Sequence, residues 1–333
     1  MAKKVLVIQT AFIGDVILAT VIIENIAKEF PGTKIDFVLR KGNESLLNNN
    51  PFVNKIISWD KSSRKYKYWF GVVKEIRKEE YDIVVNVQRF FSTGLLTILS
   101  KAKLKVGFNK NPLSFFFSKK VSHLLGNKER PIHEVDRNLL LINRIVHNPE
   151  KTIKLYPSQQ DWDEVKQYKT EAYICIAPAS VWFTKQFPKE KWIELIEQIA
   201  SSLSIYLLGG PDDIQLCNDI IRQFPQKKVM SLAGKLSLLQ SAALMKNAQM
   251  NYVNDSSPLH IASAMNAPTT AIFCSTVPDF GFGPLADQSK IIQTKQKLNC
   301  RPCGLHGFRK CPKNHFLCAL SIDVKDIVQD ASK

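Results

Sequence analysis

The sequence contains no long hydrophobic run. No segment approaches the roughly 20 apolar residues that a membrane span needs. Near the N-terminus only residues 5–9 form such a run, whereas a secretory signal requires about 7–15 apolar residues. We therefore expect a cytoplasmic protein, whose contact with a membrane would be peripheral and from the cytoplasmic side.

A Gly-x-Gly-x-x-Gly fingerprint is also missing, which argues against a dinucleotide site. Acidic residues are scarce, with 30 Asp and Glu against 46 Lys and Arg, so the net charge is +16. Residues 1–150 carry +11 of this charge and residues 151–333 carry +5. The basic first half favours phosphorylated lipid, acidic sugar or nucleic acid as a partner, although a solubilising surface would have the same composition.

Four of the seven cysteines lie close together near the end of the chain: Cys300, Cys303, Cys311 and Cys318. In a cytoplasmic protein such a cluster indicates metal or reduced thiols before disulfides. One Cys-x-x-Cys pair with two irregularly spaced cysteines is a weaker zinc pattern than two such pairs. Structural zinc, free packed thiols and a disulfide all stay open, with zinc as the candidate cofactor.

Apolar, β-branched runs alternate with helical patterns along the 333 residues. Strands are predicted over residues 4–9, 34–39, 55–59, 83–87, 105–106, 173–177, 205–208, 229–232, 250–253 and 269–273. Helices are predicted over residues 15–30, 68–80, 189–203, 213–224, 238–247, 258–265 and 323–329. This alternation predicts an α/β protein with parallel sheets in two domains, residues 1–155 and 156–333, joined in a polar segment with two prolines.

Polar residues gather in loops that follow predicted strands, where α/β proteins bind ligands. The first such loop ends in Gly14 and Asp15, with Gly14 allowing a tight turn. An aspartate at a helix start ordinarily caps the helix, and its alternative role is to accept a proton from a substrate hydroxyl. Lys185, in a later loop, would neutralise a departing diphosphate or would be a solvated surface lysine.

A third loop, Asn254 to His260, joins a predicted strand to a helix that starts at Ser257 and Pro258. The free N–H groups of such a helix start form a natural phosphate site. Asp255 suits the hydroxyls of a sugar. The alternative is a well-capped loop in which His260 packs on its own helix.

Four motifs stand in one order along the chain: VLVIQTAFIGDVILATVIIENI, KQFPKEKW, LLGGPDD and NDSSPLHIASA. Together they resemble the ADP-heptose:lipopolysaccharide heptosyltransferase family, inverting glycosyltransferases of the GT-B fold. The resemblance implies two Rossmann-like domains whose parallel sheets face each other across a cleft. The N-terminal domain would bind the acceptor and the C-terminal domain the nucleotide sugar.

The resemblance also implies roles for individual residues. Asp15 would be the general base, and Lys185 would stabilise the departing nucleotide phosphate. The donor-binding residues would be Thr184, Asp212, Asp255, Ser256, Ser257 and His260, with Asp213 an equally placed alternative to Asp212. The acceptor-binding residues would be Gly14, Arg64, Lys65 and Lys67. The chain departs from the family at Gln9, where many members have Lys or Arg, and at Ser257, where many have Gly.

The predicted reaction is transfer of heptose from ADP-heptose to the lipopolysaccharide inner core by a monomer that needs no cofactor. Two alternatives remain, a nucleic-acid-binding protein with a zinc-ribbon tail and an ADP-sugar-binding relative without catalysis. In the basic first domain, Tyr66, Tyr68 and Trp69 would offer aromatic faces to sugars. Residues 113–117, with lysines at both ends, would rest on the inner membrane or form a buried aromatic helix.

Overall fold

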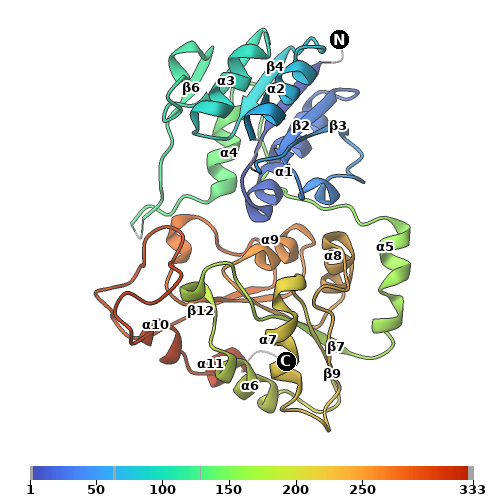
Figure 1. The fold of residues 1–333 in the computed structure, drawn as a ribbon, viewed down its shortest axis with the longest axis vertical. Coiled ribbons are helices and arrows are strands. Elements are labelled where there is room, and N and C mark those ends of the chain that lie inside the picture. Colours follow the sequence, from blue (N-terminus) through green and yellow to red (C-terminus); the bar gives the residue numbers. More distant parts are fainter. Residues whose placement is uncertain (1–2, 63–64, 128, 329–333) are drawn as a thin grey trace. The chain divides into compact units, whose positions relative to one another are not determined.

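A computed structural model describes residues 3–62, 65–127 and 129–328 of the chain (Figure 1). The chain divides into two compact units, unit 1 from Met1 to Tyr156 and unit 2 from Pro157 to Lys333. Each unit contains one parallel six-stranded sheet. The predicted α/β class with two parallel sheets is therefore confirmed.

Unit 1 is built on a sheet of the order β3-β2-β1-β4-β5-β6. Its strands are β1 (Lys4–Ile8), β2 (Lys34–Arg40), β3 (Val53–Trp59), β4 (Ile83–Asn86), β5 (Leu104–Phe108) and β6 (Lys119–Val121). Its helices are α1 (Ile13–Glu29), α2 (Lys65–Ile76), α3 (Phe91–Leu99) and α4 (Glu134–Ile142), with short 3-10 helices η1 (Glu44–Leu46) and η2 (Ser114–Phe116).

Unit 2 has a sheet of the order β12-β11-β10-β7-β8-β9. Its strands are β7 (Tyr173–Ala177), β8 (Ser204–Leu207), β9 (Val229–Ser231), β10 (Asn251–Asn254), β11 (Thr269–Phe273) and β12 (Ser289–Gln293). Its α-helices are α5 (Gln159–Glu164), α6 (Lys189–Gln198), α7 (Ile214–Ile221), α8 (Leu238–Lys246), α9 (Ser257–Ala264), α10 (Leu317–Leu320) and α11 (Lys325–Val328). Its 3-10 helices are η3 (Lys166–Tyr168), η4 (Phe183–Lys185), η5 (Pro211–Asp213) and η6 (Pro278–Phe280).

Both sheets follow the same doubly wound order. In each, the first strand lies inside the sheet, the next two extend to one side, and the fourth returns to the other side of the first. The order reverses between β1 and β4 in unit 1, and between β7 and β10 in unit 2. The carboxyl ends of these strands are where open α/β sheets bind ligands.

Helices cover both faces of a parallel sheet, and the strands of such a sheet are therefore apolar on both faces. Val5, Leu6, Val7 and Ile8 of β1 are all fully buried. Helix α1 is similarly apolar from Val16 to Ile23, and it packs against α4. Among the helices that the structure describes, none is long and apolar enough to cross a membrane.

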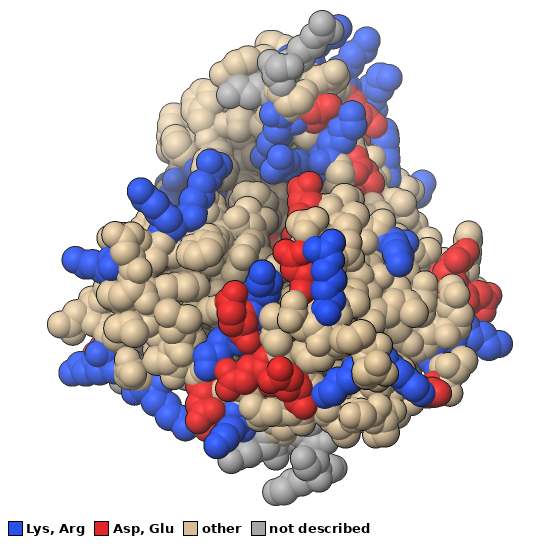
Figure 2. Space-filling view, turned by 60° about the horizontal axis from the view of Figure 1, so that its bottom comes forward, with Lys and Arg blue, Asp and Glu red and all other residues tan. Residues whose placement is uncertain are grey.

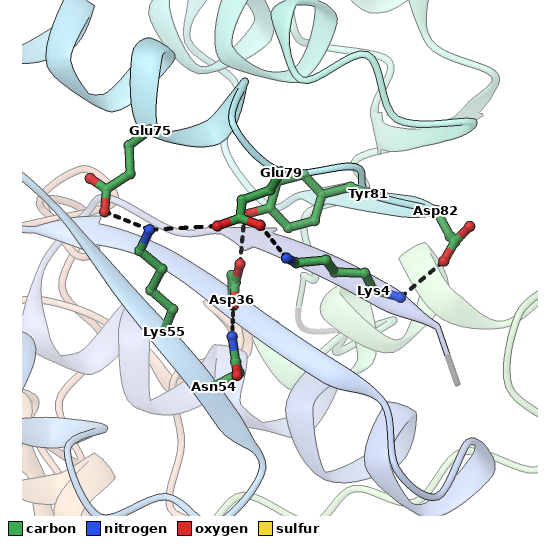
Figure 3. A network of polar contacts seen from close by, with 8 residues as sticks. All are labelled: Lys4, Asp36, Asn54, Lys55, Glu75, Glu79, Tyr81 and Asp82. Atoms are coloured by element: carbon green, nitrogen blue, oxygen red, sulfur yellow. Dashed lines mark hydrogen bonds and ion pairs between the residues drawn. The ribbon is translucent and has the colours of Figure 1, made fainter. Parts of the chain in front are cut away.

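A buried polar network occupies the amino ends of the unit 1 strands, opposite to the ligand-binding edge (Figure 3). Asp36 of β2 is fully buried and accepts hydrogen bonds from the Tyr81 hydroxyl (2.7 Å) and from Asn54 Nδ2 (2.7 Å). Burial and the neighbouring Asp36 raise the pKa of Tyr81 well above its usual range. Around these residues, Lys4 pairs with Glu79. The network therefore lies at the opposite edge of the sheet from the loops that follow the carboxyl ends of the strands.

Candidate functional site

Two charged side chains meet at the carboxyl edge of the unit 2 sheet. Lys185 ends η4, in the loop after β7, and Asp255 directly follows β10. Lys185 Nζ lies 2.7 Å from Asp255 Oδ2, and the two side chains are only 15% and 6% exposed. Thr276 Oγ1 donates to the same carboxylate oxygen at 2.6 Å. Lys185 is thus not the solvated surface lysine of the alternative interpretation, because a carboxylate holds it in a sheltered position.

Asn254 fixes the spacing of the two loops that carry this pair. Its side chain is fully buried, and Nδ2 donates to the Pro178 carbonyl at 2.8 Å. In return, Oδ1 accepts the N–H of Phe187 at 2.9 Å. Sequence analysis gave Asn254 no role, although a polar residue that ends a buried strand is a signal of this kind of support.

The start of α9 lies beside the ion pair. Ser256 is its N-cap residue, Ser257 its first residue, and Pro258 follows. The Ser256 hydroxyl turns back toward the Asn254 carbonyl (3.4 Å), and the Ser256 side chain does not cap the helix. The first N–H groups of a helix have no partner within it, so an anion bound here would satisfy them.

The C-terminal segment that contains Cys300 to Cys318, here called the tail, packs against the loop that carries Lys185. Thr184 is fully buried, and its hydroxyl oxygen accepts the Phe308 N–H (2.8 Å) and the Ser275 hydroxyl (3.0 Å). Gly307 packs so closely that a Cβ there would lie 2.9 Å from Thr184 Oγ1 and 3.1 Å from Lys185 Cγ. Thr184 stays a predicted donor contact, and in this structure its hydroxyl oxygen is hydrogen-bonded to the tail.

Two further predicted donor residues differ in their surroundings. In η5, Asp213 accepts the N–H of Gly210 at 2.8 Å, whereas Asp212 beside it is exposed. Asp212 is therefore the carboxylate of this turn that stays open to a ligand. His260 is buried on α9 with its ring 6.2 Å from that of Phe282, so it packs within unit 2.

In unit 1, Asp15 lies at the carboxyl end of β1, as the third residue of α1. Its Oδ2 accepts the N–H of Phe12 at 3.2 Å, so the carboxylate caps the helix. The tight turn predicted at Gly14 is wrong, because α1 already begins at Ile13 and Gly14 is its second residue.

Lys61 brings a cation to the loop between β1 and α1, which precedes Asp15. Its Nζ donates to the Thr10 carbonyl (2.7 Å) and hydroxyl (2.9 Å), and it lies 4.7 Å from the centre of the Trp59 ring. Burial, with a smaller effect of the Arg40 charge, lowers the pKa of Lys61 to about 8. Lys61 belongs to the same basic segment as the predicted acceptor residues Lys65 and Lys67, where cations were expected to suit the phosphates and carboxylates of an acceptor.

The other predicted acceptor residues are less informative. Arg64 lies outside the described residues, Lys65 is the first residue of α2, and Lys67 is exposed. Trp69 was expected to present a face to sugars, but it is buried and its Nε1 donates to the Ser92 carbonyl (3.1 Å). That expectation is wrong because the indole completes the core between α2 and α3.

All seven cysteines are free thiols. Cys303 and Cys318 are buried, and burial raises the pKa of Cys318 to about 11. Cys300 Sγ lies 3.8 Å from His315 Nε2. Across the described chain, no three His, Cys, Asp or Glu side chains are grouped so that they would hold a metal. Structural zinc at the four cysteines therefore stays a prediction.

Each unit has a doubly wound sheet, and unit 2 places a lysine–carboxylate pair beside a helix start, which is an arrangement suited to an anionic ligand such as a phosphate. The fold is that of heptosyltransferases. The Escherichia coli structure described as ADP-heptose LPS heptosyltransferase II superimposes with a TM-score of 0.78 at 19% identity, covering 98% of this chain and 96% of its own.

Curated relatives agree with the fold. Lipopolysaccharide heptosyltransferase 3 of Escherichia coli is 27% identical, covering 80% of this chain and 82% of its own length. Lipopolysaccharide heptosyltransferase 1 of Campylobacter coli is 24% identical over 98% and 97% of the two chains. The family described as glycosyltransferase family 9 (heptosyltransferase) matches residues 56–307. The chain belongs to this family and is a glycosyltransferase.

Proposed function

We propose that this enzyme transfers heptose from ADP-heptose to the inner core of lipopolysaccharide, with inversion at the anomeric carbon. The observation that carries the proposal is the sheltered Lys185–Asp255 pair beside the start of α9. A cation, a carboxylate and a row of helix N–H groups are what a nucleotide diphosphate sugar requires. The names of the relatives supply the identity of the sugar and of the acceptor.

On the donor side, the diphosphate would bind at the N–H groups of Ser256 and Ser257, within reach of Lys185. Asp255 would accept hydrogen bonds from sugar hydroxyls, and the exposed Asp212 would contact the ribose. As the anomeric bond to the diphosphate breaks, negative charge grows on the leaving oxygen. Lys185 and the α9 dipole stabilise that charge, which is how preorganised electrostatics lower a barrier.

On the acceptor side, Asp15 would remove the proton of the attacking hydroxyl. The oxygen then attacks the anomeric carbon from the face opposite the diphosphate, and the configuration inverts. General-base help is worth about 10²–10⁴ in rate. The hydrogen bond from Phe12 keeps the carboxylate oriented. None of these steps uses a cofactor.

Lys61 would provide the charge that the family pattern usually carries at position 9. Gln9 is buried and accepts a hydrogen bond from Gln88, so it holds the loop and has no charge to offer a ligand. Lys61 contacts the next residue, Thr10, and therefore brings an ammonium group to the same loop. A carboxylate or phosphate on the inner core is the partner that this group suits.

The decisive experiment incubates the purified full chain with ADP-heptose and a series of truncated lipopolysaccharide acceptors, and identifies products by mass. We expect one heptose to be added to one acceptor. Asp15→Asn should lower turnover at least 100-fold while ADP-heptose affinity stays within twofold. Asp219→Asn, a surface carboxylate of α7, is the matched control. Near-normal transfer by Asp15→Asn would rule out this base.

Other results would favour the alternatives. ADP-heptose binding without turnover on any acceptor would indicate a non-catalytic relative. Tight, salt-dependent binding of DNA or RNA would indicate a nucleic-acid-binding protein. Against that function, basic side chains are interspersed with acidic and uncharged ones on the face seen in Figure 2.

The proposal includes a cytoplasmic, monomeric enzyme that contacts the inner membrane only peripherally. It also retains zinc at Cys300, Cys303, Cys311 and Cys318 as a structural possibility for the tail. Metal analysis of the purified chain tests this, and one equivalent of zinc with four protected thiols is the supporting result. Reactive thiols without metal would exclude zinc and leave the proposed reaction intact.

A further inference from the structure

Six large apolar side chains are exposed on unit 1 near the outer edge of its sheet. Each is 42–65% exposed. We call this surface the aromatic face, and it consists of Phe90, Phe91, Phe115, Phe116, Leu124 and Leu125. Soluble monomers rarely leave such side chains together in water unless the surface has a partner.

Two asparagines join the three segments that carry the aromatic face. The buried Asn111 donates from Nδ2 to the Phe90 carbonyl at 3.0 Å, which links the start of α3 to the loop between β5 and β6. Asn109 accepts the Ser114 hydroxyl on its carbonyl (3.0 Å) and the His123 N–H on its side chain (3.3 Å). The segments therefore form one connected surface, close to the outer strand β6 (Figure 1).

The rings of the aromatic face stand outward and do not fill a local core. Phe115 and Phe116 in η2 have ring centroids 4.0 Å apart, and both remain more than half exposed. The next residue, Phe117, is the one that turns inward, against Gly107 of β5. This corrects the idea of a fully buried aromatic helix at residues 113–117.

The charge around the aromatic face is of one sign. Residues 83–128 contain eight Lys and Arg and no Asp or Glu. Arg89, Lys110 and Lys120 are exposed beside the apolar residues, and no carboxylate in the described part of the chain pairs with them. Lys103, further away, is the member of this segment that pairs with Asp82. The surface therefore combines apolar rings with unneutralised positive charge.

We propose that the aromatic face docks the enzyme on a lipid bilayer that contains anionic phospholipid. Aromatic and leucine side chains would enter the interfacial region while the basic side chains contact phosphate headgroups. Because this segment has basic side chains and no carboxylates, it should attract a negatively charged surface and repel a positively charged one. The inference rests on the proposed function for its purpose, because that function has an acceptor glycolipid anchored in a membrane, but docking itself requires no turnover.

The test measures sedimentation of the purified full chain with vesicles that contain no lipopolysaccharide. One set is phosphatidylethanolamine with about one third phosphatidylglycerol, and the other is phosphatidylcholine alone. We expect binding to the anionic set, weaker binding to the neutral set, and weakening by salt. Replacing both Phe115→Ser and Phe116→Ser should lower the partition coefficient at least tenfold. Replacing both Lys110→Gln and Lys120→Gln should lower it about 25-fold, or roughly fivefold for each charge.

Control positions lie in unit 2, where Met230→Ser and Lys246→Gln remove an exposed apolar and an exposed basic side chain. Both should bind like the parent chain. Transfer to a delipidated, soluble acceptor without vesicles separates docking from catalysis, and the Phe115→Ser, Phe116→Ser variant should keep its rate within twofold. Failure of the parent chain in that assay would count against the proposed function and leave docking untouched.

Three outcomes would overturn the docking proposal. The parent chain would fail to sediment with anionic vesicles, or the two variants would bind as well as the controls. In the third, binding would appear only when acceptor glycolipid is added to the vesicles, which would make this surface part of the acceptor site.

Discussion

Thr184 and Phe308 are joined by two hydrogen bonds although 124 residues separate them in the chain. The Thr184 N–H donates to the Phe308 carbonyl (3.1 Å), and the Phe308 N–H donates to the Thr184 hydroxyl (2.8 Å). Lys185 directly follows Thr184 in the chain. The tail therefore fixes the backbone next to the lysine that is proposed to bind the diphosphate. In this way the tail supports the loop that carries Lys185, which belongs to the proposed donor site.

The close packing of Gly307 makes this support testable. Gly307 has a φ of +77°, and a Cβ there would press on Thr184 and Lys185. Gly304 has a similar φ of +64°, but a Cβ there would lie 3.7 Å from its nearest neighbour, Phe308. Both alanine variants carry the backbone strain of about 1–2 kcal/mol. We expect Gly307→Ala alone to lower kcat for heptose transfer, by about tenfold. Equal kcat values in steady-state assays would show that the tail does not position Lys185.

The Lys185–Asp255 pair should matter for stability as well as for transfer. Removing one partner from a buried pair leaves an uncompensated charge, which costs about 3–5 kcal/mol. We expect Asp255→Ala to destabilise unit 2 by that order in urea unfolding. The exposed pair of Lys228 and Glu171 is the control, and Glu171→Ala should leave the urea midpoint nearly unchanged. The double variant Lys185→Met, Asp255→Ala should recover part of the loss, and a purely additive result would contradict the coupling.

Lys61 predicts a pH dependence of acceptor binding. Its pKa is lowered to about 8, so the ammonium form is present below pH 8 and is lost as the pH rises above it. We expect the KM for an anionic acceptor to increase between pH 7 and pH 9, with donor KM unchanged. Lys61→Arg keeps its charge and should flatten the profile. An identical rise in the Arg variant would assign the titration to another group.

The same lysine has an opposite effect on folding. The unfolded chain has the ordinary lysine pKa of 10.5, so between pH 8 and 10.5 the unfolded state binds more protons at this residue than the folded state. The contribution of Lys61 to the free energy of unfolding therefore rises with pH across that window. Measuring the urea midpoints of the parent chain and Lys61→Met at pH 7.5 and pH 9.5 checks this, and the midpoint of the parent chain should rise relative to that of the variant at the higher pH.

The network around Asp36 should support stability without affecting chemistry. Tyr81→Phe removes the hydroxyl that donates to a fully buried carboxylate, and hydrogen bonds to charged groups contribute about 1.5–3 kcal/mol. We expect a loss of that size in urea unfolding, with unchanged transfer per folded molecule. Glu75→Gln, on the more exposed rim of the same network, should cost about 0.5 kcal/mol or less. A drop in kcat in Tyr81→Phe at temperatures where it is folded would contradict this separation.

Much of the fold follows from local patterns in the sequence. The strand of residues 173–177 is confirmed with its predicted bounds. A short, continuous apolar run between polar loops is typical of a buried strand, which is why the pattern predicted it. The sequence pattern did not indicate α3, whose residues FSTGLLTIL include glycine, serine and threonines that favour helices weakly. Its start is held by contacts from elsewhere, such as the bond from Trp69 to Ser92, and tertiary packing of this kind is not visible in a local pattern.

The sequence predicted which loops carry the candidate site residues. It did not predict the contacts that hold these loops in place. Asp15, Lys185 and Asp255 all follow predicted strands, and resemblance to a family named their roles. The ion pair of the latter two, the support from Gly307 and the partial burial of Lys61 depend on residues far apart in the chain. Such contacts require the sheet order, which a single sequence does not specify.

The repeated strand order of the two sheets has a consequence for how specificity changes. Each unit carries its own reversal of strand order and its own loops at that edge, so neither half borrows a strand from the other to complete its binding loops. Recombination near Tyr156 and Pro157 would leave both sheets whole. Under the proposed assignment of the acceptor to unit 1 and the donor to unit 2, grafting the first half of a relative onto the second half of this chain should change the acceptor and keep the donor.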